Sequence, residues 1–208
     1  MKHSVFMMAL TLSCLVACNP PSQAQTTDQV SIQNKAASHA QVIDETKNLF
    51  QVSEGLFRSE QLTAQDLDLL KQHNIQTIVN LRYFNRGEDQ QEFGQTDVVL
   101  INQPLKSWHV SPKDIAKVLH VIQTQQQQGG VLVHCYHGSD RTGLIIGMYR
   151  VVIEGWNVDK AKTEMMQGPY GFHTIWKNMP DLFNEKTIAQ VKNELSQLQT
   201  VTLASATE

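Results

Sequence analysis

The chain has 208 residues, the length of one ordinary domain with short appendages. Its formal net charge of -3 gives no basic excess, which argues against nucleic-acid binding as the main activity. Hydrophobic residues make up 41% of the chain, an ordinary proportion, so we expect a single hydrophobic core.

The first 18 residues have the layout of an export signal. Met1-Lys2-His3 precedes an apolar run from Val5 to Ala17 that contains no acidic residue. This run is too short for a membrane helix, because the hydrocarbon core of a bilayer is about 30 Å thick. Its end, Leu15-Val16-Ala17-Cys18, resembles the bacterial lipobox, in which the cysteine is acylated and becomes the first residue of the mature chain. A plain secretory signal cleaved after an alanine is the alternative.

The lipobox resemblance implies a lipid anchor at Cys18 and a lipoprotein of the bacterial cell envelope that faces the periplasm. Asn19 stands where an Asp would favour retention in the inner membrane, so we expect the outer membrane. Cys14 leaves with the signal and Cys18 is blocked by lipid, so Cys135 has no partner for an intramolecular disulfide. Such a lone thiol in an oxidising compartment is explained by catalysis, or by burial as a small apolar side chain.

Residues 19–47 are rich in Gln, Ser, Thr and Ala without a sustained hydrophobic period, which predicts a flexible tether. We expect the folded domain at residues 48–200 and a disordered tail at 201–208. The domain starts with a loosely alternating stretch from Leu49 to Phe57, which predicts a hairpin. Thr63 is a plausible N-cap for a helix that runs to His73.

Two apolar stretches, residues 75–81 and 98–101, predict strands in the sheet interior. Ser111-Pro112 predicts the start of the next helix, with Ser as the cap and Pro at the first helical position. A third buried strand is expected at residues 131–133, followed by helices at residues 142–156, 160–167 and 181–198. This alternation predicts an α/β domain with a mainly parallel central sheet flanked by helices on both faces.

The chemistry is concentrated in the segment His134-Cys135-Tyr136-His137-Gly138-Ser139-Asp140-Arg141-Thr142-Gly143, which leaves a strand and enters a helix. A loop wound around an anion points its backbone N–H groups inward, and the following helix adds the positive end of its dipole. Arg141 adds a planar fork that can bind two phosphate oxygens. The same field favours the thiolate of Cys135, which makes it a nucleophile.

Within the segment, Gly138 allows close backbone approach, and Thr142 is placed to hydrogen-bond the thiolate or the leaving sulfur. The candidate substrate-binding residues are Tyr136, His137, Gly138, Ser139, Asp140, Arg141 and Thr142. Tyr136 and His137 either line the mouth of the site or simply face solvent. We expect His134 to support the loop from behind, because its side chain points away from that of Cys135 at the end of an extended strand.

The segment is similar to the signature of the cysteine-dependent phosphatase superfamily, which reads His-Cys, five residues, then Arg and Ser or Thr. Its flanks resemble the dual-specificity branch, particularly the bacterial members. The resemblance covers about Leu49 to Leu195 and includes residues 57–61, 79–82, 104–105 and 170–176. It implies a dual-specificity phosphatase-like fold, a phosphocysteine intermediate at Cys135, phosphate binding by Arg141, and neither metal nor other cofactor.

The substrate class implied by this resemblance is a phosphomonoester: a protein phosphorylated on Tyr or on Ser/Thr, a phosphoinositide, or a small phosphate ester. Two alternatives stay open. A pseudophosphatase that only binds phosphate is disfavoured, because both Cys135 and Arg141 are present. A rhodanese-type sulfurtransferase also uses a Cys loop, but the Arg-Thr-Gly ending fits phosphatases better.

In this family the general acid, which protonates the leaving group, is an Asp on a mobile loop upstream of the Cys. This sequence departs from that pattern, because the stretch Gln103–His109 contains no carboxylate. The candidates are Asp140, Asp114 and His109. Asp114 is well explained by the free N–H groups of a first helical turn. Asp140 resembles the Asp that myotubularins and some bacterial phosphatases carry at this place, where it has been considered as the proton donor, so we place it beside Cys135 and Arg141 as a catalytic candidate. The alternative is that it pairs with a neighbouring Lys or Arg and shapes the loop.

Four more residues have two interpretations each. Arg58 and Arg82 lie at candidate strand ends, where they either recruit the anion or are ordinary solvated arginines. Trp108 and Trp176 either pack against the domain or contribute to a lid over the site.

Overall fold

The computed structural model describes residues 39–205 of the chain. The export signal, Cys18 and the first part of the predicted tether therefore lie outside the described residues. Within residues 39–205, no helix combines the length and the hydropathy that are needed to span a membrane.

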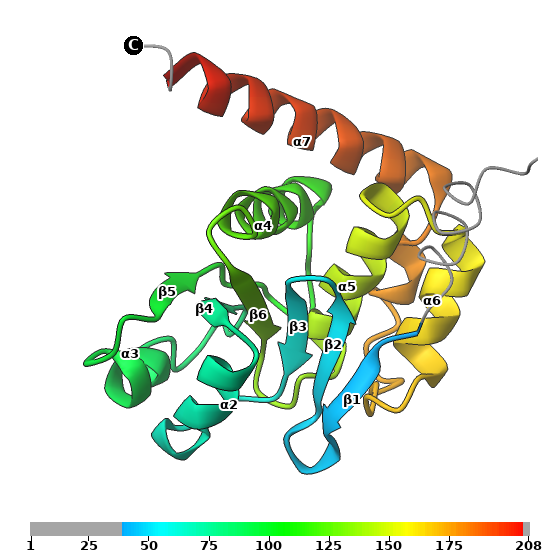
Figure 1. Cartoon of the computed structure of the whole chain (residues 1–208). Coiled ribbons are helices and arrows are strands. Elements are labelled where there is room, and N and C mark those ends of the chain that lie inside the picture. Colours follow the sequence, from blue (N-terminus) through cyan, green and yellow to red (C-terminus); the bar gives the residue numbers. More distant parts are fainter. Residues whose placement is uncertain (1–38, 206–208) are drawn as a thin grey trace, which may run out of the picture.

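A six-stranded sheet in the order β1-β2-β3-β6-β4-β5 forms the centre of the domain (Figure 1). Strands β3, β6, β4 and β5 run parallel, whereas β1, β2 and β3 are joined antiparallel. The predicted α/β class with a mainly parallel sheet is confirmed, as is the hairpin, which is formed by β2 and β3. The strands are β1 (Gln41–Asp44), β2 (Leu49–Ser53), β3 (Leu56–Ser59), β4 (Ile75–Asn80), β5 (Val99–Asn102) and β6 (Gly130–His134).

Helices cover both faces of the sheet (Figure 1). Helices α2 and α3 lie on one face, and α4, α5, α6 and α7 lie on the other. The helices are η1 (Glu45–Lys47), η2 (Ala64–Asp66), α2 (Leu67–Gln72), α3 (Glu88–Phe93), α4 (Pro112–Gln125), α5 (Asp140–Val152), α6 (Val158–Gln167), η3 (Pro180–Leu182) and α7 (Glu185–Ser205).

Strand alternation divides the core into two layers, because successive side chains point to opposite faces of a sheet. Val131 and Val133 of β6 pack in the larger cluster with residues of α4, α5 and α7. Leu132, between them, packs in the smaller cluster with Leu70 of α2 and Phe93 of α3. The central strand β6 is therefore buried on both faces, and the position of its C-terminal end is fixed from both sides.

Helix α4 starts where the sequence predicted. The Ser111 hydroxyl accepts a hydrogen bond from the backbone N–H of Asp114 at 3.2 Å, and the Asp114 carboxylate accepts from the backbone N–H of Ser111 at 3.0 Å. Pro112 occupies the first turn, where its missing N–H costs no helical hydrogen bond. This reciprocal capping box engages the carboxylate of Asp114.

Three expectations need correction, and one helix was missed. Residues 41–47 are not tether, because β1 pairs with β2 and η1 continues it. The domain does not end at residue 200, because α7 continues to Ser205. Strand β5 is not sheet interior: it is the last strand in the order, and Val99 is 48% exposed. Helix α3, with its acidic and amide-rich sequence, was not predicted at all.

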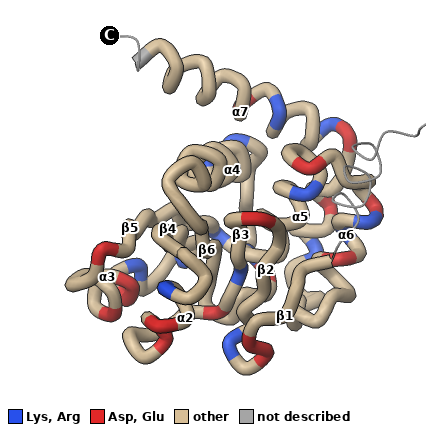
Figure 2. The backbone as a smooth tube through the Cα atoms, viewed as in Figure 1, with Lys and Arg blue, Asp and Glu red and all other residues tan. Residues whose placement is uncertain are grey.

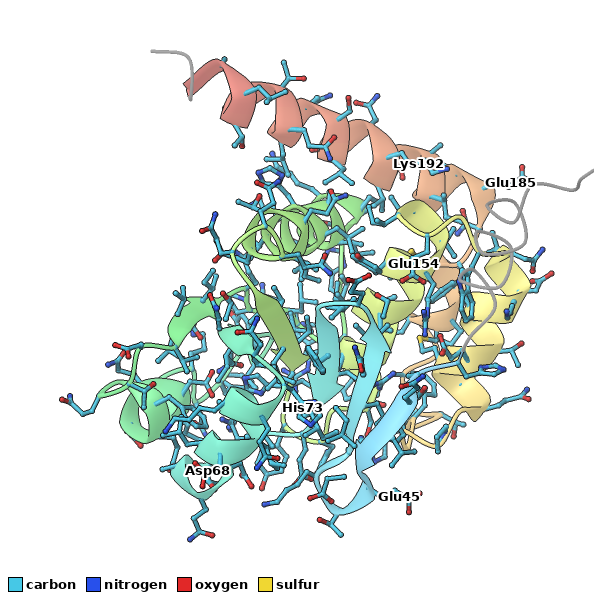
Figure 3. The ribbon with its side chains drawn as sticks, in the orientation of Figure 1. Glu45, Asp68, His73, Glu154, Glu185 and Lys192 are labelled. Atoms are coloured by element: carbon cyan, nitrogen blue, oxygen red, sulfur yellow. The ribbon has the colours of Figure 1, made fainter. Side chains whose placement is uncertain are left out.

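The two ends of the sheet differ in character. Glu154, just beyond α5, lies at the end opposite to the one where β3 and β6 terminate (Figures 1 and 3). It lines a pocket with Gly55, which precedes β3, and Gly130, which begins β6. The candidate site occupies the other end, where the parallel strands finish.

Candidate active site

The site is a loop between β6 and α5, here called the Cys loop (residues 135–141). Cys135 directly follows the last residue of β6 and is only 3% exposed. The backbone N–H of Gln61 donates to the carbonyl oxygen of Tyr136 at 3.0 Å, and that of Leu81 donates to His134 at 2.9 Å. The segments after β3 and β4 therefore hold the loop from two sides, which the parallel strand order makes possible.

Gly138 is the point of closest approach between the Cys loop and the sheet. Its φ of +70° lies in the left-handed region, which glycine adopts without steric cost. A Cβ at this position would lie 2.4 Å from the carbonyl oxygen of Ser59. The close backbone approach expected at Gly138 is therefore an approach to the end of β3.

Arg58 fixes the same turn from inside the domain. Its Nη2 donates to the carbonyl oxygen of Gly138 at 2.7 Å, and its guanidinium lies 3.6 Å from the centre of the Tyr170 ring. The side chain is fully buried, and this desolvation lowers its pKa to about 10, so it stays cationic at neutral pH. Neither interpretation from the sequence was right, because Arg58 is neither a surface residue nor free to recruit an anion.

Arg82 is also buried and already paired. It forms an ion pair with Glu88, and its Nη1 donates to Oε1 of Gln61 at 3.0 Å. The guanidinium lies 4.9 Å from the centre of the Tyr136 ring. Arg82 therefore supports the Cys loop rather than serving as a solvated arginine.

Beneath the loop lies a buried polar cluster centred on Asp89. Its carboxylate accepts hydrogen bonds from Gln61 Nε2 at 2.5 Å and Asn80 Nδ2 at 2.7 Å, and it lies 3.1 Å from His134 Nε2. Burial alone would raise the pKa of Asp89, but His134 and the two amides together lower it. Sequence reasoning missed Asp89, because α3 was not predicted.

His134 has the buried, supporting position that was expected of it. Its Nδ1 lies 2.9 Å from the carbonyl oxygen of Cys135, and its Nε2 faces the carboxylate of Asp89. The ring therefore links the backbone of Cys135 to the buried carboxylate of Asp89.

Two candidate substrate-binding residues, Arg141 and Thr142, lie at the start of α5. Arg141 Nη1 reaches the carbonyl oxygen of Leu81 at 3.4 Å, which turns its guanidinium toward the end of β4. The Thr142 hydroxyl is buried and has no hydrogen-bond partner among residues 39–205. A buried hydroxyl usually has a partner, so that of Thr142 is available for a sulfur or a bound anion.

The three acid candidates have different surroundings. Asp140 accepts hydrogen bonds from the backbone N–H of His173 at 2.8 Å and lies 3.0 Å from the Nδ1 of the same residue. Its partner is thus a histidine rather than a neighbouring Lys or Arg. Asp114 is held in the capping box of α4, and His109 is exposed at the end of a turn closed on Lys106. His173 had no predicted role.

Three aromatic side chains, Tyr83, Phe84 and Trp108, pack together, and Phe84 and Trp108 are exposed. Trp108 is 55% exposed and stacks on Phe84 with ring centroids 6.4 Å apart. Tyr83 contacts both rings edge-on, and Tyr136 of the loop is itself 54% exposed. Trp176, in contrast, packs against the larger core cluster. The packing interpretation therefore fits Trp176, whereas Trp108 stays at the surface.

Charge around the site is mixed in sign. Figure 2 shows acidic and basic residues interspersed along the backbone, with no face of one sign in this view. Within the described residues, no group of three or more His, Cys, Asp or Glu side chains is placed to hold a metal ion.

Fold and site together define a class: an α/β domain whose central strand delivers a cysteine to the N-terminus of a helix, in a loop that can surround an anion. The sequence model described as "Tyrosine phosphatase family" matches residues 45–198, so the chain belongs to the tyrosine phosphatase family. It is 32% identical to the dual specificity protein phosphatase TpbA of Pseudomonas aeruginosa (strain UCBPP-PA14) over 165 residues, which are 79% of this chain and 72% of TpbA.

Solved structures agree with this assignment. The crystal structure of P. aeruginosa TpbA superposes with a TM-score of 0.69 at 29% identity, covering 76% of this chain and 96% of TpbA. A Cys-to-Ser variant of TpbA in complex with phosphotyrosine gives a TM-score of 0.69 at 28% identity, over the same shares of the two chains. The catalytic core of the PP-IP phosphatase SIW14 from S. cerevisiae, at 17% identity and a TM-score of 0.56, covers 71% of this chain and 92% of its own, and shares the fold.

The protein is therefore a phosphoric monoester hydrolase of the tyrosine and dual-specificity type, which acts on a phosphorylated substrate. Its membership of this family favours the phosphatase over the pseudophosphatase and the sulfurtransferase.

Proposed function

We propose that this phosphatase cleaves phosphomonoesters in two steps through a phosphocysteine at Cys135. In the first step the thiolate attacks phosphorus, and the ester P–O bond breaks. In the second step water attacks the same phosphorus, the P–S bond breaks, and the thiolate is restored. The observation that carries the proposal is the position of Cys135, buried at the end of β6 and before the N-terminus of α5.

The residues around Cys135 have complementary roles in this proposal. The backbone N–H groups of residues 136–141 and the fork of Arg141 bind the phosphate oxygens. The free Thr142 hydroxyl stabilises the sulfur as it leaves phosphorus in the second step. His134 and Arg58 support the loop from the protein side through the carbonyl oxygens of Cys135 and Gly138. No metal or other cofactor is needed for these steps.

We propose phosphotyrosine in proteins as the preferred substrate, ahead of phosphoserine or phosphothreonine, phosphoinositides and small phosphate esters. The exposed aromatic side chains of Phe84, Trp108 and Tyr136 support this choice, since aromatic faces pack well on an aryl ring. The phosphotyrosine complex of the related TpbA supports it as well.

The mechanism is tested with p-nitrophenyl phosphate in a rapid-mixing experiment. A burst of nitrophenol equal to the enzyme concentration, followed by slower turnover, is expected when the phosphoenzyme accumulates. Phosphate-labelled enzyme trapped by acid quenching and located on Cys135 by mass spectrometry confirms the intermediate. Absence of both label and turnover would contradict the proposal. A panel of phosphopeptides and phosphoinositides then ranks the substrates.

We further propose that the enzyme is a lipoprotein held by acyl chains on Cys18, with the phosphatase domain facing the periplasm and the anchor in the outer membrane. The lipobox-like Leu15-Val16-Ala17-Cys18 and the following Asn19 support this proposal. Residues 19–38 would then separate the anchor from the domain.

A further inference from the structure

The chain after α6 returns to the Cys loop and is fixed beside it. Asn48 Nδ2 donates to the carbonyl oxygens of both His137 and Tyr170, at 2.8 and 3.1 Å. A Cβ on Gly171 would lie 3.3 Å from the hydroxyl oxygen of Ser139. Asn48 therefore bridges this segment to the loop at Tyr170, Gly171 passes close to Ser139, and the next residues lie beside the loop.

His173 follows in this segment and is bound to Asp140 twice. The backbone N–H donates to the carboxylate at 2.8 Å, and the ring Nδ1 lies 3.0 Å from the second carboxylate oxygen. The ring is 5.6 Å from that of His137 in the Cys loop, and the side chain is 51% exposed. Its Nε2 makes no hydrogen bond within the part of the chain that the structure describes.

Asp140 itself is poorly placed to donate a proton. One oxygen accepts from the backbone N–H of His173 and the other faces its Nδ1, so a proton held on Asp140 would point at this ring nitrogen rather than at a leaving oxygen. The remaining carboxylate, Asp114, belongs to the capping box of α4. The stretch 103–109 carries no carboxylate at all. A histidine oriented by an aspartate is the arrangement that hydrolases use to transfer protons near neutral pH.

We infer that His173 is the general acid of this phosphatase and that Asp140 is its positioning residue. The inference rests on the two-step mechanism proposed above. As the ester P–O bond breaks, the leaving oxygen takes the bonding electron pair and receives the proton from His173 Nε2. In the second step, the attacking water gives a proton to the now neutral Nε2 while the P–S bond breaks. Asp140 keeps Nδ1 protonated and stabilises the imidazolium.

The test compares leaving groups within each variant. An acid matters when the departing alkoxide is basic and hardly at all when it is a stabilised phenolate. His173→Asn can keep an amide donor near the position of Nδ1 but has no proton to transfer. We expect it to lower the ratio of kcat/KM for an alkyl phosphate to that for p-nitrophenyl phosphate by about 10²-fold. His109→Asn tests the other histidine candidate for the acid, and its ratio should equal that of the wild type.

Asp140→Asn should lower the same ratio, and adding it to His173→Asn should lower the ratio no further, because both act on one proton transfer. An unchanged ratio in His173→Asn overturns the inference, and so does a selective loss in His109→Asn. A ratio lowered by Asp140→Asn but not by His173→Asn would identify Asp140 as the acid instead. Both substrates are measured with the same preparation, so unfolded enzyme lowers both values of kcat/KM by the same factor. The ratio is therefore unaffected by partial unfolding. A wild type that shows neither phosphoenzyme nor turnover would refute the two-step mechanism, a result separate from the ratio.

Discussion

His134 Nε2 and the Asp89 carboxylate lie 3.1 Å apart in the protein interior, and His134 Nδ1 lies 2.9 Å from the carbonyl oxygen of Cys135. A buried carboxylate from α3 is thus linked through one imidazole to the backbone of Cys135. Asn80 and Gln61 supply the remaining donors to Asp89.

Asp89→Asn should lower the free energy of unfolding at pH 7 by about 1–3 kcal/mol, because the new NH₂ group must face a donor and leaves it unsatisfied. Urea unfolding measures this, with the exposed Asp68→Asn as the control. The pKa of Asp89 is lowered from its ordinary 3.8, so its stabilising effect is present above pH 3.8 and is lost as the pH falls through the folded-state pKa. The difference in the free energy of unfolding between wild type and variant should therefore shrink as the pH falls over that range. A difference that grows on acidification would contradict this account.

Gly138→Ala should disrupt the Cys loop, because the new Cβ meets the carbonyl oxygen of Ser59 at 2.4 Å in addition to the cost of a positive φ. Gly155→Ala is the matched control: its φ of +71° is nearly the same, and its Cβ meets nothing within 4 Å. We expect Gly138→Ala to be less stable than Gly155→Ala by about 2 kcal/mol or more, and much less active on p-nitrophenyl phosphate. Equal unfolding midpoints for the two variants would show that the loop is not held against β3.

Cys135→Ser should abolish turnover while keeping affinity for a phosphate analogue, because a hydroxyl is a poor nucleophile without a base and the ring of amides is unchanged. Turnover is followed with p-nitrophenyl phosphate, and binding of tungstate by calorimetry. Vanadate should inhibit the wild type competitively, as a mimic of the five-coordinate transition state. Substantial turnover by the serine variant would rule out Cys135 as the nucleophile.

Cys18→Ala should release the protein from the membrane fraction, because acyl chains are proposed as its only anchor. Fractionation of cells that express the full chain measures the release, with Cys135→Ser as a control that should stay with the membranes. Mass spectrometry of the mature N-terminus checks for the lipid directly. An unmodified N-terminus after an alanine cleavage site would contradict the lipobox interpretation.

The sequence alone determined the features that depend on neighbouring residues. The Cys loop is one contiguous segment, and the function proposed for it rests on the spacing of Cys135 and Arg141 between a strand and a helix. Helix α4 was predictable for the same reason, since its capping box involves residues three positions apart. The alternation of strands and helices was enough to predict the α/β class, because each periodicity is local.

Only the tertiary structure decided which distant residues meet this loop. Arg58 binds Gly138 across 80 positions, Asp89 meets His134 across 45, and Asp140 meets His173 across 33. These contacts depend on the order β3-β6-β4 and on where α3 and the segment after α6 pack, which no local periodicity specifies. In sequence, a buried arginine or a carboxylate in a short helix looks like a solvated surface residue. Its role emerges only when burial removes water and leaves the protein to supply its hydrogen-bond partners.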